Sequence, residues 1–459
     1  MKKKVALHSL GCKVNAYETQ AMGEMFKNRG YEIVPFEKGA DIYVINTCTV
    51  TNIADRKSRQ MLHKAKKMNE NAIVVAVGCY AQAFCDDLKK DSVIDLIVGN
   101  DRKKEIVELV EKQLNENTDE KPMDDRKTIS VIDINDTKMK HEYEELNIDS
   151  MNEHTRAYIK IQDGCNQFCT YCIIPYARGR VRSRDPENIM MEVDRLIQKG
   201  YKEIVLTGIH LSSYGIDFGD TRSERLIDVI KKIGEKSEIK RIRLGSLEPR
   251  IITDEFMKQL KSVPSFCPHF HLSLQSGCDE TLKRMNRRYT TKEFLDGCHL
   301  IRKYYEDAAI TTDVIVGFPN ETEEEFNKSK EFLETVGFAK MHIFKYSKRE
   351  GTKAAAMDGQ IPDELKAKRS NELIRLDEKM HQNYLEKFVG RRINVLFEEI
   401  ININGEEYYI GHTKEYVKVA LNIETIHRKN ANHTGALENE LVEVSVQGLL
   451  NNEIVLAIL

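Results

Sequence analysis

The N-terminal quarter of the chain alternates short apolar runs with amphipathic stretches. Val5–Leu10, Ile42–Asn46 and Ala72–Val77 are short, rich in β-branched residues and bounded by polar ones, so they predict strands. Asn15–Arg29 and Asn52–Met68 repeat their apolar positions at helical spacing and predict helices between these strands. Alternation of strands with helices favours a parallel, doubly wound α/β sheet.

The middle of the chain repeats a strand followed by a helix. The six candidate strands are Ala157–Gln162, Glu203–Thr207, Arg241–Leu244, His269–Leu274, Ile310–Val316 and Met341–Tyr346. Six units are too few to close an eight-stranded barrel, so we expect an open (βα)6 partial TIM barrel. Polar and glycine-rich residues follow the strands, and the chemistry of such barrels lies at that end.

The C-terminal part of the chain has five short β-rich stretches after a charged helix at residues 363–382. They are Arg392–Phe397, Tyr408–His412, Tyr416–Leu421, Glu440–Gln447 and Glu453–Ile458. No helical pattern separates them, which predicts a small antiparallel, OB-like β-barrel. Such barrels often bind oligonucleotides, although a purely structural cap would show the same pattern.

These patterns divide the chain into four parts. They are an N-terminal α/β domain (1–115), an acidic, polar linker (116–150), the partial barrel (151–382) and the small β-barrel (383–459). Because the last part is the one expected to bind nucleic acid, removal of residues 384–459 should weaken that binding and leave the chemistry of the larger barrel intact.

Composition narrows the class of protein. An apolar fraction of 41% across 459 residues excludes global disorder, and a net charge of −3 means that any nucleic-acid partner must be met by local basic patches. No apolar run approaches the eighteen residues of a membrane span. Ten cysteines without a signal-peptide pattern indicate a reducing compartment, the cytoplasm, and metal or catalytic use rather than disulfides.

Three cysteines follow the first barrel strand with C-x3-C-x2-C spacing: Cys165, Cys169 and Cys172. Thiolates select iron–sulfur clusters, zinc or copper, and a cubane cluster normally takes four of them. Three thiolates leave one iron open, which is the arrangement of a catalytic cluster. The alternative is a zinc knot completed by a distant ligand.

A second set of cysteines lies in the N-terminal domain. Cys12, Cys48 and Cys79 each come directly after a predicted strand. The carboxyl ends of parallel strands meet at one edge of the sheet, where ligands bind, so these thiols should converge on a second three-cysteine metal site. The alternative is that they are three buried small hydrophobic residues.

A run of arginines follows the first cysteine motif: Arg178, Arg180, Arg182 and Arg184. A solvated charge run is the usual interpretation of such a pattern. Its position at the mouth of a reaction site instead predicts contacts to the phosphates of an RNA.

The C-x3-C-x2-C motif, followed by Ile173-Ile-Pro-Tyr, resembles the radical S-adenosylmethionine (SAM) superfamily. This resemblance implies that the open iron binds SAM and that a low-potential electron donor reduces the cluster. It also implies that residues after the barrel strands and beside the cluster contact SAM: Tyr171, Ser246, Glu248, Gln275, Gly317 and Phe318.

All three blocks together resemble the methylthiotransferase family of radical SAM enzymes. The resemblance implies two 4Fe-4S clusters, an auxiliary one on the N-terminal cysteines and a SAM-binding one on the barrel cysteines, with a C-terminal TRAM domain. Ser9-Leu-Gly-Cys-Lys-Val-Asn-Ala-Tyr-Glu and Arg243-Leu-Gly-Ser-Leu-Glu-Pro look like the MtaB branch. Asn320 departs from the family, where glycine often follows Gly-Phe-Pro.

The branch implies a substrate and a reaction. Its members convert N6-threonylcarbamoyladenosine at position 37, in the anticodon stem-loop of tRNA, to the 2-methylthio derivative, and they need a sulfur source. Sibling branches act on isopentenyl-adenosine in tRNA or on an aspartate of a ribosomal protein. An RNA-binding iron–sulfur redox sensor is the alternative from another class.

Overall fold

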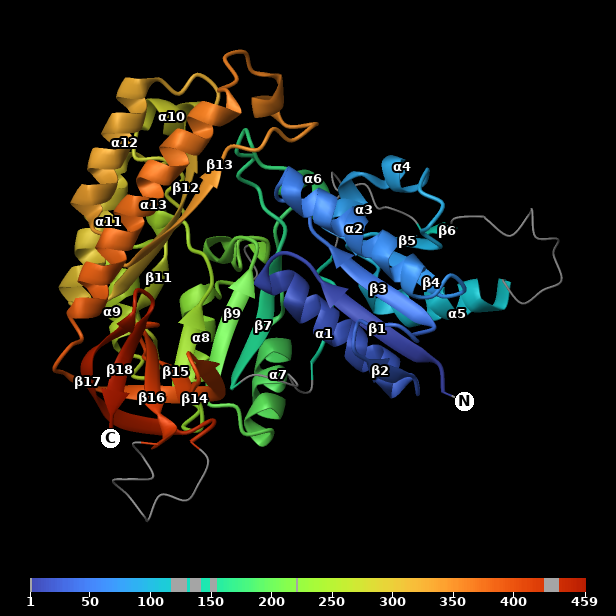
Figure 1. Cartoon of the computed structure of the whole chain (residues 1–459), viewed down its shortest axis with the longest axis horizontal. Helices are drawn as coiled ribbons and strands as arrows, with labels where there is room; N and C mark the ends of the chain where they lie inside the picture. The colour runs from blue at the N-terminus through green and yellow to red at the C-terminus, as the bar shows by residue number, and fades with distance from the viewer. Residues whose placement is uncertain (1, 117–129, 133–141, 149–154, 220–221, 425–436) are drawn as a thin grey trace.

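The computed structural model describes residues 2–116, 130–132, 142–148, 155–219, 222–424 and 437–459. Figure 1 shows an N-terminal domain (blue) beside a central domain (green to orange), with a small barrel (red) at the lower end of the central strands. Among the described helices, none is both long enough and apolar enough to cross a membrane.

The N-terminal domain is built on a six-stranded sheet, which confirms the predicted parallel arrangement. Its strands are β1 (Lys4–Ser9), β2 (Glu32–Val34), β3 (Ile42–Thr47), β4 (Ile73–Gly78), β5 (Leu96–Val98) and β6 (Ser130–Ile132), in the order β2-β1-β3-β4-β5-β6. Strand β6 comes from the segment expected to be a linker, so part of that segment belongs to the sheet.

Helices cover both faces of this sheet, as a doubly wound fold requires. They are α1 (Lys13–Asn28), α2 (Asn52–Met68), α3 (Cys79–Ala83), α4 (Cys85–Leu88) and α5 (Ile106–Glu116), with a 3-10 turn at Lys103–Glu105. Helix α2 packs Leu62 and Ala65 on one face, while α1 and α5 pack Phe26 and Val110 on the other. The Thr51 hydroxyl caps α2 by accepting the N–H of Ala54.

The central domain contains the six predicted parallel strands. They are β7 (Arg156–Asp163), β9 (Glu203–Gly208), β10 (Arg241–Leu244), β11 (His269–His271), β12 (Ala309–Val316) and β13 (Lys340–Lys345), and a short β8 (Arg182–Ser183) pairs antiparallel with β7. Parallel bridges, Ile242 to Phe266 and Leu247 to Leu272, join the β10-β9-β7 sheet to the β11-β12-β13 sheet. We call this arrangement the central arc.

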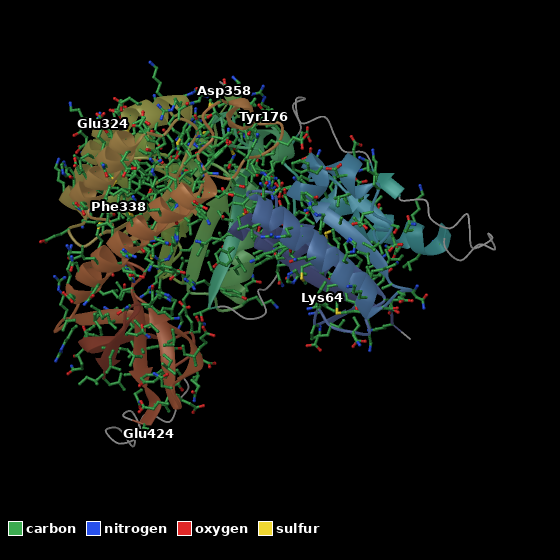
Figure 2. All side chains as sticks on the ribbon, turned by 45° about the horizontal axis from the view of Figure 1, so that its top comes forward. Lys64, Tyr176, Glu324, Phe338, Asp358 and Glu424 are labelled. Atoms are coloured by element: carbon green, nitrogen blue, oxygen red, sulfur yellow. The ribbon has the colours of Figure 1, made fainter. Side chains whose placement is uncertain are left out.

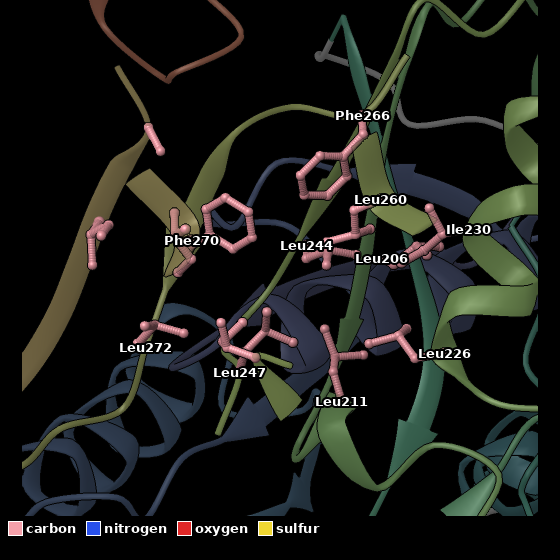
Figure 3. Packing of buried hydrophobic residues seen from close by; sticks show 14 of the residues in the cluster. Leu206, Leu211, Leu226, Ile230, Leu244, Leu247, Leu260, Phe266, Phe270 and Leu272 are labelled. Atoms are coloured by element: carbon pink, nitrogen blue, oxygen red, sulfur yellow. The ribbon is translucent and has the colours of Figure 1, made fainter. Parts of the chain in front are cut away.

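Helices pack along the outside of the central arc. They are α7 (Pro186–Gln198), α8 (Leu226–Gly234), α9 (Asp254–Lys261), α10 (Asp279–Arg284), α11 (Thr291–Tyr304), α12 (Glu323–Val336) and α13 (Asp363–Glu386), with 3-10 turns at Leu211–Ser213, Pro249–Ile251 and Lys353–Ala356. The short helix α6 (Ile174–Arg178) packs instead against α3 of the N-terminal domain. Figure 3 shows the apolar layer between strands and helices, where Leu206 and Leu244 face Leu226 and Ile230. This layer fixes the strands whose ends carry the site.

The C-terminal strands form a closed barrel. They are β14 (Arg392–Ile403), β15 (Glu406–His412), β16 (Lys418–Asn422), β17 (Leu441–Asn451) and β18 (Ile454–Ile458), in the order β14-β15-β16-β18-β17. The prediction of an all-antiparallel barrel is wrong at one position, because β16 and β18 pair in parallel. The two strands are not neighbours in sequence, so no hairpin forces them to be antiparallel.

The small barrel is docked on the central arc through buried arginines. Arg241 donates to the main-chain carbonyls of His412 (2.6 Å) and Asn394 (3.0 Å), and Arg243 donates to those of Lys414 (2.9 Å) and Thr413 (3.2 Å). Removing residues 384–459 would leave both guanidinium groups without these acceptors. The truncation therefore removes buried contacts of the central arc, and the expectation that it leaves the chemistry of the larger barrel intact stays a prediction.

Candidate functional site

The C-x3-C-x2-C motif forms a loop between β7 and α6. The loop folds back on itself, and the N–H of Cys165 donates to the carbonyl of Gly179 at 3.0 Å. Gly164 has a φ of +69°, and a Cβ there would collide with the carbonyl oxygen of Arg180. Only glycine fits this turn, which brings the cysteines to the carboxyl end of the arc.

The three thiols of this loop are neighbours. Burial raises the pKa of Cys165 to about 11 and that of Cys172 to about 12, and the nearby thiol of Cys169 raises both. Such thiols are protonated at neutral pH, and a bound metal would displace their protons.

Arg287 belongs to this site, although no sequence pattern singled it out. Its Nη1 lies 3.2 Å from the Cys169 sulfur, its Nε donates to the Tyr289 hydroxyl, and its Nη2 donates to the Ser273 carbonyl. It lies in the loop after α10, far from the cysteines in sequence. The guanidinium supplies positive charge beside a set of sulfur ligands.

Cys12, Cys48 and Cys79 converge as the sequence predicts. They follow β1, β3 and β4, which are adjacent in the sheet. Burial raises the pKa of Cys12 and raises that of Cys48 to about 11, and the neighbouring thiols add to both effects. A Cβ on Gly11 would lie 2.7 Å from the Cys48 sulfur, so this glycine leaves room for the thiol.

The donor chemistry of the two sets fits iron–sulfur clusters. Within the described ranges, no three Cys, His, Asp or Glu side chains are arranged to hold a single metal ion. The thiolates of a cluster bind different irons, whereas a zinc knot places four ligands on one ion. Two groups of three neighbouring thiols therefore fit two clusters better than zinc.

Arg178, on the helix after the barrel cysteines, contacts the N-terminal cysteine set instead of solvent. Its Nε lies 3.1 Å from the Cys79 sulfur, and its Nη1 pairs with Glu18 (2.9 Å) and Asp163 (3.1 Å). Lys160 pairs with both of these carboxylates, at 2.8 and 2.6 Å. Burial alone would raise the pKa values of Glu18 and Asp163, but the surrounding cations, Arg178 above all, hold both below their usual range.

The predicted RNA contacts of Arg178, Arg182 and Arg184 are wrong in this structure. All three side chains are buried and ion-paired: Arg182 with Asp101, and Arg184 with Glu145 and Glu192. The sequence places the arginines together but does not show the distant carboxylates that neutralise them.

Arg180 is the exposed member of the run. Its guanidinium lies 4.6 Å from the ring centroid of Phe168, and that ring packs edge-on against Tyr176. Tyr176 is 42% exposed, and Figure 2 shows it at the edge of the molecule, near the N-terminal domain. A cation and aromatic rings at the surface beside the cysteine loop form a stacking platform of the kind that single-stranded RNA uses.

The predicted SAM contacts divide into two groups. Ser246 is exposed at the end of β10, and Glu248 and Gln275 lie on loops at the same end of the arc. Burial raises the pKa of Glu248, and the charge of Arg287 opposes this rise. The ring of Phe318 is fully enclosed beside Tyr171, and the SAM contacts of these two residues stay predictions.

Gly317 lies close to helix α13, and its contact with SAM stays a prediction. A Cβ at this position would collide with the side chain of Lys366 on α13, so the glycine makes room for a protein contact. His210, just after β9, was not predicted; its Nε2 is buried without a hydrogen-bond partner among the described residues. Burial and Arg287 lower the pKa of His210 to about 4, so a neutral ring faces this region.

One cavity of about 820 Å³ connects all three parts of the chain. Cys12 and Ile174 line it near the two cysteine sets, Ser246 lines it on the arc, and Tyr416 and Lys418 line it on the small barrel. Its size suits a nucleoside-sized group.

Two family models match the chain. The model described as "Radical SAM superfamily" matches residues 159–333, and the model described as "Uncharacterized protein family UPF0004" matches residues 4–99. The first range covers the central arc as far as α12, and the second covers strands β1 to β5 of the sheet that carries Cys12, Cys48 and Cys79.

Curated relatives align along most of their length. Threonylcarbamoyladenosine tRNA methylthiotransferase MtaB of Bacillus subtilis is 40% identical, over 90% of this chain and 89% of the relative. The protein of the same name from Aquifex aeolicus is 42% identical, over 88% and 95%. A tRNA-2-methylthio-N(6)-dimethylallyladenosine synthase of Bacteroides fragilis is 32% identical, over 90% and 88%.

Among solved structures, the radical S-adenosylmethionine methyltransferase TsrM of Kitasatospora setae, with cobalamin and a [4Fe-4S] cluster bound, resembles this chain with a TM-score of 0.52. The likeness covers 75% of each chain at 14% identity. At that identity it supports the fold alone.

Proposed function

This chain belongs to the MtaB branch of the radical SAM methylthiotransferases, and on that premise we propose that it methylthiolates C2 of N6-threonylcarbamoyladenosine at position 37 of tRNA. It is a transferase that uses SAM and [4Fe-4S] clusters. The observation that carries the proposal is the presence of two three-cysteine sets in one chain, with Cys12 of the first set and Ile174, just after the second set, lining one cavity. A redox sensor would need neither the second set nor the shared cavity.

When bound, the clusters and SAM supply the radical, sulfur and methyl chemistry. The residues of the chain hold and separate these groups. Cys165, Cys169 and Cys172 would bind the SAM cluster, and Cys12, Cys48 and Cys79 the auxiliary cluster. Ser246, Glu248 and Gln275 offer hydrogen bonds to SAM, and Arg287 places positive charge beside Cys169.

The remaining assignments follow from the family. The central arc would act as a partial TIM barrel over residues 151–382, and the small barrel as a TRAM domain over residues 383–459 that binds the anticodon stem-loop. Arg180 and its aromatic neighbours would contact the same loop. A low-potential electron donor and a sulfur source complete the set of partners, and a tRNA substrate places the enzyme in the cytoplasm.

The substrate is tested with paired tRNAs. One carries threonylcarbamoyl-adenosine at position 37 and the other isopentenyl-adenosine, and both are incubated with reconstituted enzyme, SAM and reductant. We expect the methylthio product, measured by nucleoside mass spectrometry, from the first tRNA only. Preference for the isopentenyl form would move the protein to the sibling branch, whose members are also similar in sequence.

The metal content is tested separately. Two clusters would give about eight irons per chain, and replacing Cys165, Cys169 and Cys172 together by alanine should lower this to about four. Replacing the buried Cys267, Cys278 and Cys298 is the matched control and should leave iron unchanged. Equal iron in the first variant and the wild type would refute the two-site assignment.

A further inference from the structure

We propose that Lys13, together with His269, binds the carboxylate of the threonylcarbamoyl group and so selects the substrate. This inference rests on the proposed function, because it concerns the part of that substrate that distinguishes it from isopentenyl-adenosine. The threonylcarbamoyl group is an anion, and the isopentenyl group is a hydrocarbon.

Lys13 lies beside the chemistry. It is the first residue of α1, directly after Cys12, and both residues line the cavity. Its side chain is open to the cavity, although protein surrounds much of it, and its Nζ lies 6.0 Å from the ring centroid of Tyr158 on β7. A base presented to the auxiliary cluster would bring its N6 substituent within reach of this ammonium.

The charge around Lys13 is incompletely balanced. No ion pair to Lys13 is found among the described residues, whereas its cationic neighbours Arg156 and Arg243 pair with Glu398 and Glu203. Both arginines lie close enough to repel the Lys13 ammonium. An anionic group from a ligand would relieve this repulsion and form a charge-assisted hydrogen bond.

The acidic residues of the cavity are mostly engaged elsewhere. Asp313 lies 3.2 Å from His271, and Glu453 lies 2.7 Å from Lys340. These pairs leave Lys13 as a cation available to a ligand.

His269 provides a second donor. It is the first residue of β11 and lines the same cavity, and its Nδ1 is buried without a hydrogen-bond partner among the described residues. Burial, then Arg243 and Lys13, hold its pKa well below the usual value, so the ring is neutral. When Nε2 accepts from the Thr311 hydroxyl, 3.5 Å away, the ring carries its proton on Nδ1, and a carboxylate oxygen can accept that proton.

The test measures affinity and does not depend on turnover. Three anticodon stem-loops are bound to reconstituted enzyme: one with threonylcarbamoyl-adenosine, one with its methyl ester, and one with unmodified adenosine. We expect the wild type to bind the acid at least about tenfold more tightly than it binds the ester. The loss of one charged hydrogen bond weakens binding by about this factor. Lys13→Met should bind acid and ester equally, and its affinity for the unmodified loop should not change.

Two further variants serve as a conservative replacement and as a control. Lys13→Arg keeps the charge and should keep part of the preference. Lys27→Met removes an exposed lysine from the last turn of the same helix, outside the cavity, and should keep all of it. Retention of the preference in Lys13→Met would overturn the proposal.

The outcomes separate this proposal from the function on which it rests. A wild type that binds the acid and the unmodified loop equally contradicts the assigned substrate. A wild type that prefers the modified loops but binds acid and ester equally contradicts carboxylate recognition, and this result needs no variant. Iron content is measured in every variant, because Lys13 follows Cys12.

Discussion

Replacing Arg178 by methionine is expected to destabilise the protein by about 3–5 kcal/mol, because it removes one of the cations that neutralise two buried carboxylates. Arg178 is 1% exposed and pairs with Glu18 of the N-terminal domain and Asp163 of the central domain. The substitution keeps most of the side-chain volume, so any stability that is lost comes from the missing charge and hydrogen bonds. Urea unfolding of the reconstituted protein measures it.

Arg180→Met is the matched control for this experiment. Arg180 lies two residues away on an exposed surface, and its guanidinium lies over the ring of Phe168. We expect its removal to change the free energy of unfolding by less than about 1 kcal/mol. Equal stability of Arg178→Met and wild type would show that the buried network does not hold the domains together.

Replacing Cys48 by alanine is expected to abolish the methylthio product and to preserve cleavage of SAM to 5′-deoxyadenosine. Cys48 belongs to the N-terminal set at the end of β3, whereas the SAM-binding set lies on the loop after β7. One variant therefore separates the two activities, and chromatography of the nucleosides measures both.

Cys85→Ala tests whether the effect is specific to the converging set. Cys85 begins α4 in the same domain and is not one of the three converging thiols. We expect it to keep both activities. Since metal binding couples to folding, iron content and circular dichroism are recorded for both variants. Full methylthiolation by Cys48→Ala would contradict the division of roles.

The sequence predicted the strands well because strand patterns are local. Val5–Leu10 and Ile42–Asn46 match β1 and β3 to within a residue at each end, and their order in a parallel sheet brings the cysteines after them together. The convergence of Cys12, Cys48 and Cys79 could therefore be inferred without a structure.

Long-range charge pairing could not be predicted in this way. Arg178 and Glu18 are 160 residues apart, and nothing in the Arg178–Arg184 run distinguishes a buried arginine from a solvated one. Arg287 was missed for the same reason, since its contact with Cys169 depends on a loop from the other half of the arc. The parallel pairing of β16 with β18 also depends on how the barrel closes, which the sequence of one strand does not specify.

The docking of the small barrel has an evolutionary consequence. Arg241 and Arg243 bind carbonyl oxygens of residues 394 and 412–414, and every amino acid carries such an oxygen. These contacts constrain the path of the main chain and do not depend on which side chains those residues carry. Substitutions elsewhere on the outer surface of the barrel can therefore accumulate while two arginines keep it attached to the same scaffold.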